Sequence, residues 1–181
     1  MKEKIINQTI ELFNEFGPRF SMETLSKKLK ISKKTLYKYF SSKEKLLEYI
    51  IDESFNEIHQ KQEIIYNSNL GCESKLREIL TTSFSREDSI RFEKIQEIKK
   101  YYPTLFNKIE ERYKQQWDYV EELLLEGEKN NIFEFWSISY LIALMKSAMS
   151  LVISHLDGSI SYKKAINQSI NNIVDSIKKE D

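Results

Sequence analysis

The sequence predicts an all-α protein of about nine helices, and its composition and periodicity both indicate this. Only 4 Gly and 2 Pro occur among 181 residues, and 31% of the residues are charged. Few turn formers and many Glu, Lys, Leu and Ile favour helices, because straight-chain residues lose little side-chain freedom in them. Apolar residues recur every three or four positions, whereas no long stretch alternates as a half-buried strand does. We therefore expect helices joined by short connections.

Start and stop signals divide the chain into its expected elements. Gly17 ends a first helix whose apolar residues lie at helical spacing. A long fourth helix begins at Ser41 or Ser42, where a hydroxyl can cap it, and the turn formers of residues 67–71 end it. The complete set of helices is expected over residues 2–16, 21–29, 32–40, 41–66, 73–85, 89–101, 103 to 127 or 130–131, 135–156 and 161–179.

The stretch from residue 20 to 43 predicts a helix-turn-helix. Ser21 and Ser32 each stand where a hydroxyl caps a helix N-terminus. Each serine lies within an apolar pair at the positions of a hydrophobic staple, namely Phe20 with Leu25 and Ile31 with Leu36. Only two residues separate the first of these helices from the cap of the second, which is the spacing of a helix-turn-helix.

This stretch is also strongly basic. Residues 19–45 carry nine Lys or Arg against two acids, a balance of +7 in a chain whose net charge is zero. In the second helix Leu36 and Phe40 lie one turn apart and face inward, which leaves an outer face of Lys33, Lys34, Thr35, Tyr37 and Lys38. Such a face suits a phosphate backbone and base edges. The alternative is a small amphipathic helix pair with a solvated basic side.

These residues resemble the DNA-binding domain of the TetR family of bacterial transcriptional regulators. The resemblance covers roughly the first quarter of the chain and rests on Ile5-Ile6, Leu12-Phe13, Gly17, Ser21, the segment from Ile31 to Phe40, Lys43-Glu44 and Leu46. Three features depart from the family pattern. Thr9 and Ser26 replace small alanines, Lys30 stands where a glycine is usual, and the connection after the first helix is one residue short. A left-handed backbone at Lys30 would cost about 1 kcal/mol.

The resemblance implies a role for each residue of the motif. The recognition helix, from Lys33 to Phe40, would lie in the major groove, with base edges or adjacent phosphates reached by Lys34, Thr35 and Tyr37. Lys43 would clamp a phosphate, helped by the N-terminal dipole of the fourth helix. For Tyr39, packing against the first helix is the alternative to DNA contact. The expected DNA-binding residues are Ser21, Ser32, Lys33, Lys34, Thr35, Tyr37, Lys38, Tyr39 and Lys43.

The rest of the chain predicts a second domain. We expect a helix-turn-helix domain over residues 1–46 and a helical effector-binding and dimerisation domain over residues 47–181, tied together by the long fourth helix. Residues 138–156 are long enough to span a membrane, but Lys146 near the middle favours a buried helix. The expected dimer interface comprises Ala148, Leu151, Ile166, Ile170, Ile173 and Ile177, for which an intramolecular core is the alternative.

The middle helices carry many aromatic residues beside a few polar ones. Large apolar walls with few polar groups are typical of a small-molecule site. The expected effector-binding residues are Phe55, His59, Gln62, Phe84, Phe92, Gln96, Tyr113, Trp117 and Met149. The alternative is that these aromatic residues fill the core completely.

No catalytic chemistry, metal site or cofactor is expected. His59 and His155 lack a second ligand at metal spacing, and the single Cys72 excludes an internal disulfide and is typical of a reducing cytosol. The expected function is that of a cytoplasmic, ligand-responsive homodimer that binds a palindromic operator in double-stranded DNA; the resemblance implies that it is usually a repressor. Two alternatives stay open: a helical small-molecule sensor or carrier with a vestigial DNA-binding head, and an enzyme that uses the aromatic-rich cavity.

Overall fold

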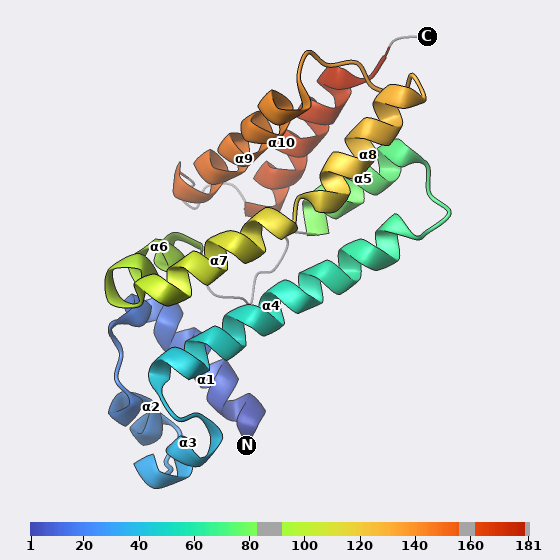
Figure 1. Cartoon of the computed structure of the whole chain (residues 1–181). Helices are drawn as coiled ribbons and strands as arrows, with labels where there is room; N and C mark the ends of the chain where they lie inside the picture. Colours follow the sequence, from blue (N-terminus) through green and yellow to red (C-terminus); the bar gives the residue numbers. More distant parts are fainter. Residues whose placement is uncertain (83–91, 156–161, 180–181) are drawn as a thin grey trace. The chain divides into compact units, whose positions relative to one another are not determined.

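The computed structural model describes residues 1–82, 92–155 and 162–179, and these ranges are built from helices (Figure 1). The predicted all-α class is confirmed. The elements in chain order are α1 (Lys2–Phe16), η1 (Gly17–Arg19), α2 (Met22–Lys28), α3 (Lys33–Tyr39), α4 (Lys43–Tyr66), α5 (Cys72–Thr82), α6 (Phe92–Tyr101), α7 (Pro103–Gln115), α8 (Asp118–Lys129), α9 (Ile138–His155) and α10 (Tyr162–Ile177).

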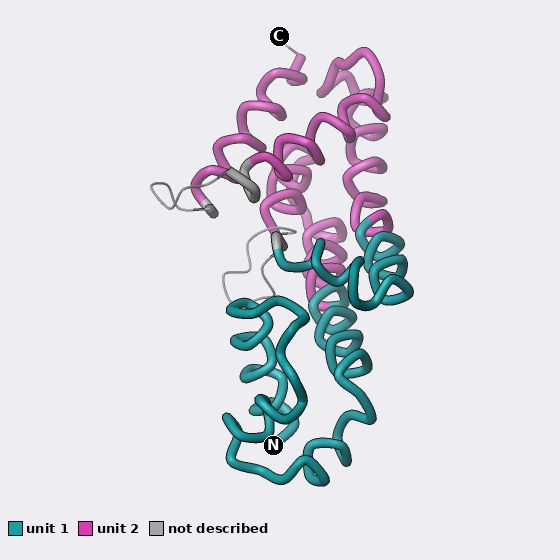
Figure 2. The backbone as a smooth tube through the Cα atoms, turned by 90° about the vertical axis from the view of Figure 1, so that its left-hand side faces the viewer, with its two compact units in different colours: residues 1–56, 88–113 teal, residues 57–87, 114–181 magenta. Residues whose placement is uncertain are grey.

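The chain divides into two compact units, drawn in different colours in Figure 2. The first unit comprises residues 1–56 and 88–113, and the second comprises residues 57–87 and 114–181. Helix α4 belongs to both, because the boundary falls between its residues 56 and 57. The first unit is thus larger than the predicted helix-turn-helix domain, since α6 and most of α7 belong to it. The division of function at residue 46 stays a prediction.

The first unit has one apolar core shared by six helices. Its buried residues come from α1 to α4 and from α6 and α7, and they include Leu12, Phe13, Leu25, Leu36, Leu46, Ile50, Ile98, Phe106 and Ile109. Gly17, which has a φ of 61°, fits close against α6, because a Cβ at this position would lie 2.7 Å from an oxygen of Glu97. Arg19 forms an ion pair of 3.1 Å with the same carboxylate. These contacts fix the loop that leads into α2.

The second unit is a bundle in which α5 packs against α8 and α10, and α9 packs against α8 and α10. Arg77 of α5 links α5 to α10. Its guanidinium donates to Glu73 on its own helix at 2.8 Å, and to Asn171 at 2.9 Å and Asp175 at 2.5 Å on α10. The end of α10 is held as well, because Lys179 N donates to the Ile132 carbonyl at 3.0 Å.

The connection after α8 is packed unusually tightly. The Phe133 side chain is 2% exposed and lies on the backbone of α8. A Cβ built on Gly127 would lie only 2.1 Å from the Phe133 ring. The amides of Ile132 and Phe133 both donate to the Gly127 carbonyl, at 2.8 and 3.2 Å, and therefore hold the ring in this position.

The long helix predicted from residue 103 to residue 127 or 130–131 is two helices in the structure. Helix α7 ends at Gln115 and α8 begins at Asp118, with the Trp117 amide donating to the Lys114 carbonyl at 3.1 Å. Gln116 and Trp117 are 7% and 5% exposed, so the break itself is buried. Neither Gly nor Pro lies at the break. The apolar periodicity of the sequence therefore continues across it and predicts a single helix.

The isoleucines expected at the dimer interface are mostly covered by their own chain. Ile166, Ile170 and Ile177 are 2%, 1% and 6% exposed, and Ile173 is half-buried. Hydrophobic spacing shows that one face of α10 is apolar but does not show what covers it. These three side chains therefore have almost no surface left for a second copy, and the alternative, an intramolecular core, describes them.

Cys72 is buried at the start of α5. Its thiol donates to the Leu123 carbonyl at 3.2 Å, and burial raises the pKa of the thiol to about 11. Within the described ranges no three metal-binding side chains lie close enough together to hold an ion. None of the helices described combines the length and apolar character that crossing a bilayer requires.

Candidate DNA-binding site

The two helices of the motif begin as the sequence predicts. The Ser21 hydroxyl accepts a hydrogen bond of 3.0 Å from the Thr24 amide, and the Ser32 hydroxyl accepts one of 3.0 Å from the Thr35 amide. Phe20, at 4% exposure, belongs to the same core as the fully buried leucines of α2 and α3. The predicted caps are thus confirmed, and the apolar flanks anchor both helices in the first unit.

The turn between α2 and α3 contains a residue with a left-handed backbone, at the position where the family usually has glycine. Lys30 has a φ of 55°. Its amide donates to the Lys27 carbonyl at 3.1 Å, and the Ile31 amide donates to the Ser26 carbonyl at 3.0 Å. These bonds form a Schellman motif, which satisfies the last carbonyls of α2. A lysine in this conformation carries a strain of roughly 1 kcal/mol that a glycine would not.

Helix α3 turns its apolar side inward and its polar side to solvent. Leu36 and Phe40 are 0% and 6% exposed, whereas Tyr37 and Tyr39 are 47% and 45% exposed. The lysines predicted for DNA contact are also exposed, namely Lys33, Lys34 and Lys38. Thr35 is half-buried, and its hydroxyl lies 2.9 Å from the Ser32 hydroxyl. The outer face of α3 therefore presents ammonium and phenol groups, which can donate hydrogen bonds to phosphates and to base edges.

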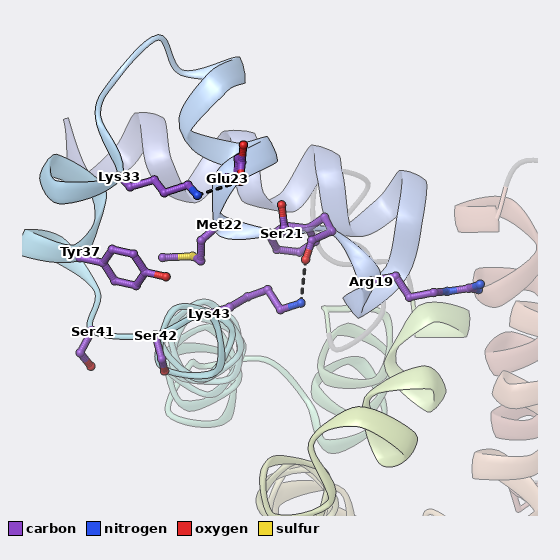
Figure 3. A pocket seen from close by; sticks show the side chains of 10 residues that line it. Arg19, Ser21, Met22, Glu23, Lys33, Tyr37, Ser41, Ser42 and Lys43 are labelled. Atoms are coloured by element: carbon purple, nitrogen blue, oxygen red, sulfur yellow. Dashed lines mark hydrogen bonds and ion pairs between the residues drawn. The ribbon is translucent and has the colours of Figure 1, made fainter.

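A hollow of about 520 Å³ lies beside this face, among α2, α3 and the start of α4 (Figure 3). Its walls combine cations, hydroxyls and one carboxylate, from Arg19, Phe20, Ser21, Met22, Glu23, Lys33, Tyr37, Ser41, Ser42 and Lys43. Ser42, rather than Ser41, caps α4, because its hydroxyl accepts the Lys45 amide at 3.1 Å. Six residues of this hollow were not among the predicted site residues, namely Arg19, Phe20, Met22, Glu23, Ser41 and Ser42.

Lys43 is turned into the protein. Its ammonium donates to the carbonyls of Pro18 and Phe20, each at 2.7 Å, and lies 5.1 Å from the Phe20 ring centroid (Figure 3). Burial lowers the pKa of this ammonium. With two of its three protons committed, Lys43 ties the start of α4 to the loop before α2. The sequence showed its position at a helix start but not the direction of its side chain, and the phosphate-clamp role stays a prediction.

Glu23 is the acid in the middle of this basic surface. Its carboxylate lies 2.8 Å from the Lys33 ammonium and 3.0 Å from that of Lys27 (Figure 3 shows the first contact). The hydrogen bond from Lys33, followed by that from Lys27, lowers the pKa of Glu23 to about 2. The carboxylate is therefore ionised at neutral pH. It forms ion pairs with two lysines that would otherwise be available to a DNA phosphate.

Glu23→Gln should tighten binding to all DNA sequences alike. The substitution removes a negative charge from the surface and releases Lys33, so we expect the slope of log affinity against log salt to steepen by about 1. Fluorescence anisotropy at several salt concentrations measures this. Glu53→Gln, an exposed acid on α4, serves as the control and should change nothing. Weaker binding by Glu23→Gln would show instead that the ion pair positions Lys33 for DNA.

The residues predicted for the effector site fall in both units. Gln62, Trp117 and Met149 are buried in the second unit, where His59 is exposed and stacks on Tyr119 at 5.5 Å between ring centroids. The members in the first unit are Phe55, Gln96 and Tyr113, of which Gln96 is exposed. Phe84 and the side chain of Phe92 lie outside the described residues. The prediction omitted two residues: Lys146, whose ammonium lies 4.9 Å from the Trp117 ring centroid, and Gln116, whose backbone carbonyl accepts a hydrogen bond from Gln62.

The capped helices α2 and α3, their buried apolar flanks and the exposed basic face of α3 are the features of a helix-turn-helix DNA-binding protein. A model of the family described as bacterial regulatory proteins, tetR family, matches residues 5–50. An uncharacterised HTH-type transcriptional regulator of Bacillus subtilis (strain 168), YvaF, is 30% identical over 127 residues, which are 70% of this chain and 67% of that protein. The chain therefore belongs to the TetR family of bacterial transcriptional regulators.

Solved structures support the fold over the whole chain. The ketosteroid transcriptional regulator KstR2 of Mycobacterium tuberculosis is similar with a TM-score of 0.81 at 17% identity, covering 99% of this chain and 95% of that one. AibR, solved with isovaleryl coenzyme A and operator DNA, has a TM-score of 0.73 at 15% identity, covering 94% and 96%. At these identities the similarity concerns the fold alone.

Proposed function

We propose that this regulator is a cytoplasmic homodimeric repressor that binds a palindromic operator and releases it when a small molecule binds the second unit. The observation that carries the proposal is the outer face of α3, where Lys34, Tyr37 and Lys38 are exposed on a helix whose other side is fixed in the core. The fold it shares with AibR, which was solved with both an acyl coenzyme A and operator DNA, supports the ligand response.

The test is binding to DNA fragments from the promoters beside the gene that encodes the chain. We expect one fragment to bind specifically and to contain an inverted repeat, with half-sites centred one helical turn, ~34–36 Å, apart. Affinity for any DNA should fall steeply with salt, because lysines displace counterions from several phosphates. A flat salt response, or no fragment preferred over random DNA, would overturn the proposal and favour a sensor with a vestigial head.

For the dimer we propose the exposed side of α9 and the loop before it. Trp136, Tyr140, Leu144 and Leu151 are 91%, 59%, 44% and 59% exposed. The spacing of the last three, four and seven residues, places them along one face of α9, and the Trp136 ring in the loop before the helix lies 5.8 Å from that of Tyr140. An exposed apolar stripe of this kind marks an interaction surface. Two residues of the predicted interface belong to α9. Leu151 lies on this exposed face, and Ala148, three residues earlier, is half-buried.

Leu151→Glu should therefore produce monomers that remain folded. A buried glutamate in the middle of an apolar interface opposes association, whereas on a monomer surface it costs little. Analytical ultracentrifugation measures the mass, and operator binding should be lost with the dimer. Leu125→Glu, on a leucine of α8 that is 49% exposed, is the matched control and should remain dimeric. Ile170→Glu should unfold the second unit instead, because that side chain is 1% exposed within one chain. A dimeric Leu151→Glu would contradict this interface.

A further inference from the structure

Lys146 is a half-buried cation of the second unit, and no carboxylate of the described residues forms an ion pair with it. It lies near the middle of α9, is half-buried, and has its ammonium 4.9 Å from the centroid of the buried Trp117 ring. Among the described residues, no carboxylate lies within ion-pair distance of it. Glu121 and Lys114 act on it only at longer range and with opposite signs, and burial lowers the pKa of the ammonium. A cation without a counter-ion costs stability unless it has another use.

Gln116, the residue before Trp117 in the chain, provides a second donor. Its side chain is 93% buried, since only 7% is exposed, and its Nε2 has no hydrogen-bond partner among the described residues. Its backbone carbonyl accepts a bond of 3.3 Å from Nε2 of the buried Gln62. A buried donor that lacks an acceptor is rare in folded proteins and requires an explanation such as a ligand.

Both groups offer hydrogen-bond donors. The Lys146 ammonium and Nε2 of Gln116 each donate, and the face of the Trp117 ring that the ammonium covers is apolar. The same helix as Lys146 contributes Met145 and Met149, each 1% exposed. An acceptor that carries negative charge and is attached to an apolar body complements this arrangement.

We propose that Lys146 and Gln116 form the polar end of the effector site, and that the effector is a carboxylic acid with an apolar tail. This rests on the proposed ligand response of the second unit. A single ammonium and a carboxamide match one carboxylate charge, whereas a phosphate is commonly held by an arginine fork. Arg77, the arginine described in this unit, is already committed to Glu73, Asn171 and Asp175.

The test is a fluorescence titration of Trp117 with three probes of equal chain length: octanoate, 1-octanol and octylamine. The other tryptophan, Trp136, is replaced by phenylalanine so that the signal comes from Trp117 alone. We expect octanoate to give a saturable change at concentrations below micelle formation, with 1-octanol at least tenfold weaker and octylamine weaker still. Equal affinity for octanoate and 1-octanol, or no saturable response to octanoate, would overturn the proposal.

Variants of the two donors complete the test. Lys146→Met should weaken octanoate at least tenfold, Lys146→Arg should retain part of the affinity, and Gln116→Leu should also weaken it. Lys129→Met, at an exposed lysine that ends α8, should leave it unchanged. The thermal transition of each variant is recorded, and Gln116→Leu tests the site even where Lys146→Met does not fold. Folded donor variants that bind octanoate as tightly as the parent would refute the site. Because the readout needs no DNA, absence of operator binding would refute the proposed repressor without affecting this result.

Discussion

Tyr37→Ala is expected to lower the preference for the operator over random DNA by about 1–3 kcal/mol, the range for losing a specific base contact. Lys34→Ala should do the same. Tyr37 is 47% exposed on α3, so its loss leaves the buried face of that helix, Leu36 and Phe40, intact. Anisotropy with labelled operator and with a scrambled duplex, both at one salt concentration, gives the preference directly.

Two controls separate base reading from electrostatic attraction. Lys38→Ala removes a residue expected on the phosphate backbone and should weaken operator and random DNA equally, reducing the salt slope by about 1. Lys99→Ala removes an exposed lysine of α6, outside the motif, and should have no effect. If Tyr37→Ala and Lys38→Ala lower both affinities by the same factor, α3 does not read bases through Tyr37.

Gly127→Ala should destabilise the second unit by about 2 kcal/mol, although alanine is the better helix former by about 1 kcal/mol. The new methyl group would lie 2.1 Å from the Phe133 ring, which is 2% exposed and tethered by its own amide to the Gly127 carbonyl. For a chain of this size the transition should fall by roughly 4–8 °C in calorimetry. Adding Phe133→Leu should reduce the further cost of Gly127→Ala, because the two substitutions act on one contact.

Gly71→Ala is the matched control, because a Cβ at Gly71 meets no atom within 4 Å. Its stability should stay within about 1 kcal/mol of the parent, since the lost flexibility of the unfolded chain offsets a weaker cap. A Gly127→Ala protein as stable as Gly71→Ala would show that the Phe133 ring moves aside at no cost.

The helix-turn-helix could be predicted because its determinants are local. A serine cap depends on the three residues after it, and the caps at Ser21 and Ser32 were read correctly for that reason. The sequence also marked Lys30, in the place of a usual glycine, as a position where a left-handed backbone could occur, and its φ is 55°. The first helix and the end of the fourth were also located, at Phe16 and Tyr66, because turn formers follow them.

The features that the sequence did not reveal depend on which helices pack against one another in the folded chain. The break at Trp117 is stabilised by burial in the second unit, and no local residue type announces it. The apolar stripe of α10 is visible in the sequence, but its partners, which bury Ile166 and Ile170, lie elsewhere in the chain. A helix-start lysine such as Lys43 has the same sequence signature whether it points outward to a phosphate or back to a carbonyl.

The buried thiol of Cys72 has a practical consequence for measuring how the two recognition helices move. With a pKa of about 11, only about one thiol in a thousand is ionised at pH 8, and the thiolate is the form that reacts with maleimides. A cysteine introduced at an exposed position such as Lys99 would therefore take up a dye selectively in the otherwise native chain. A donor and an acceptor dye on the two subunits would then report the separation of the DNA-binding units, with and without octanoate, by energy transfer.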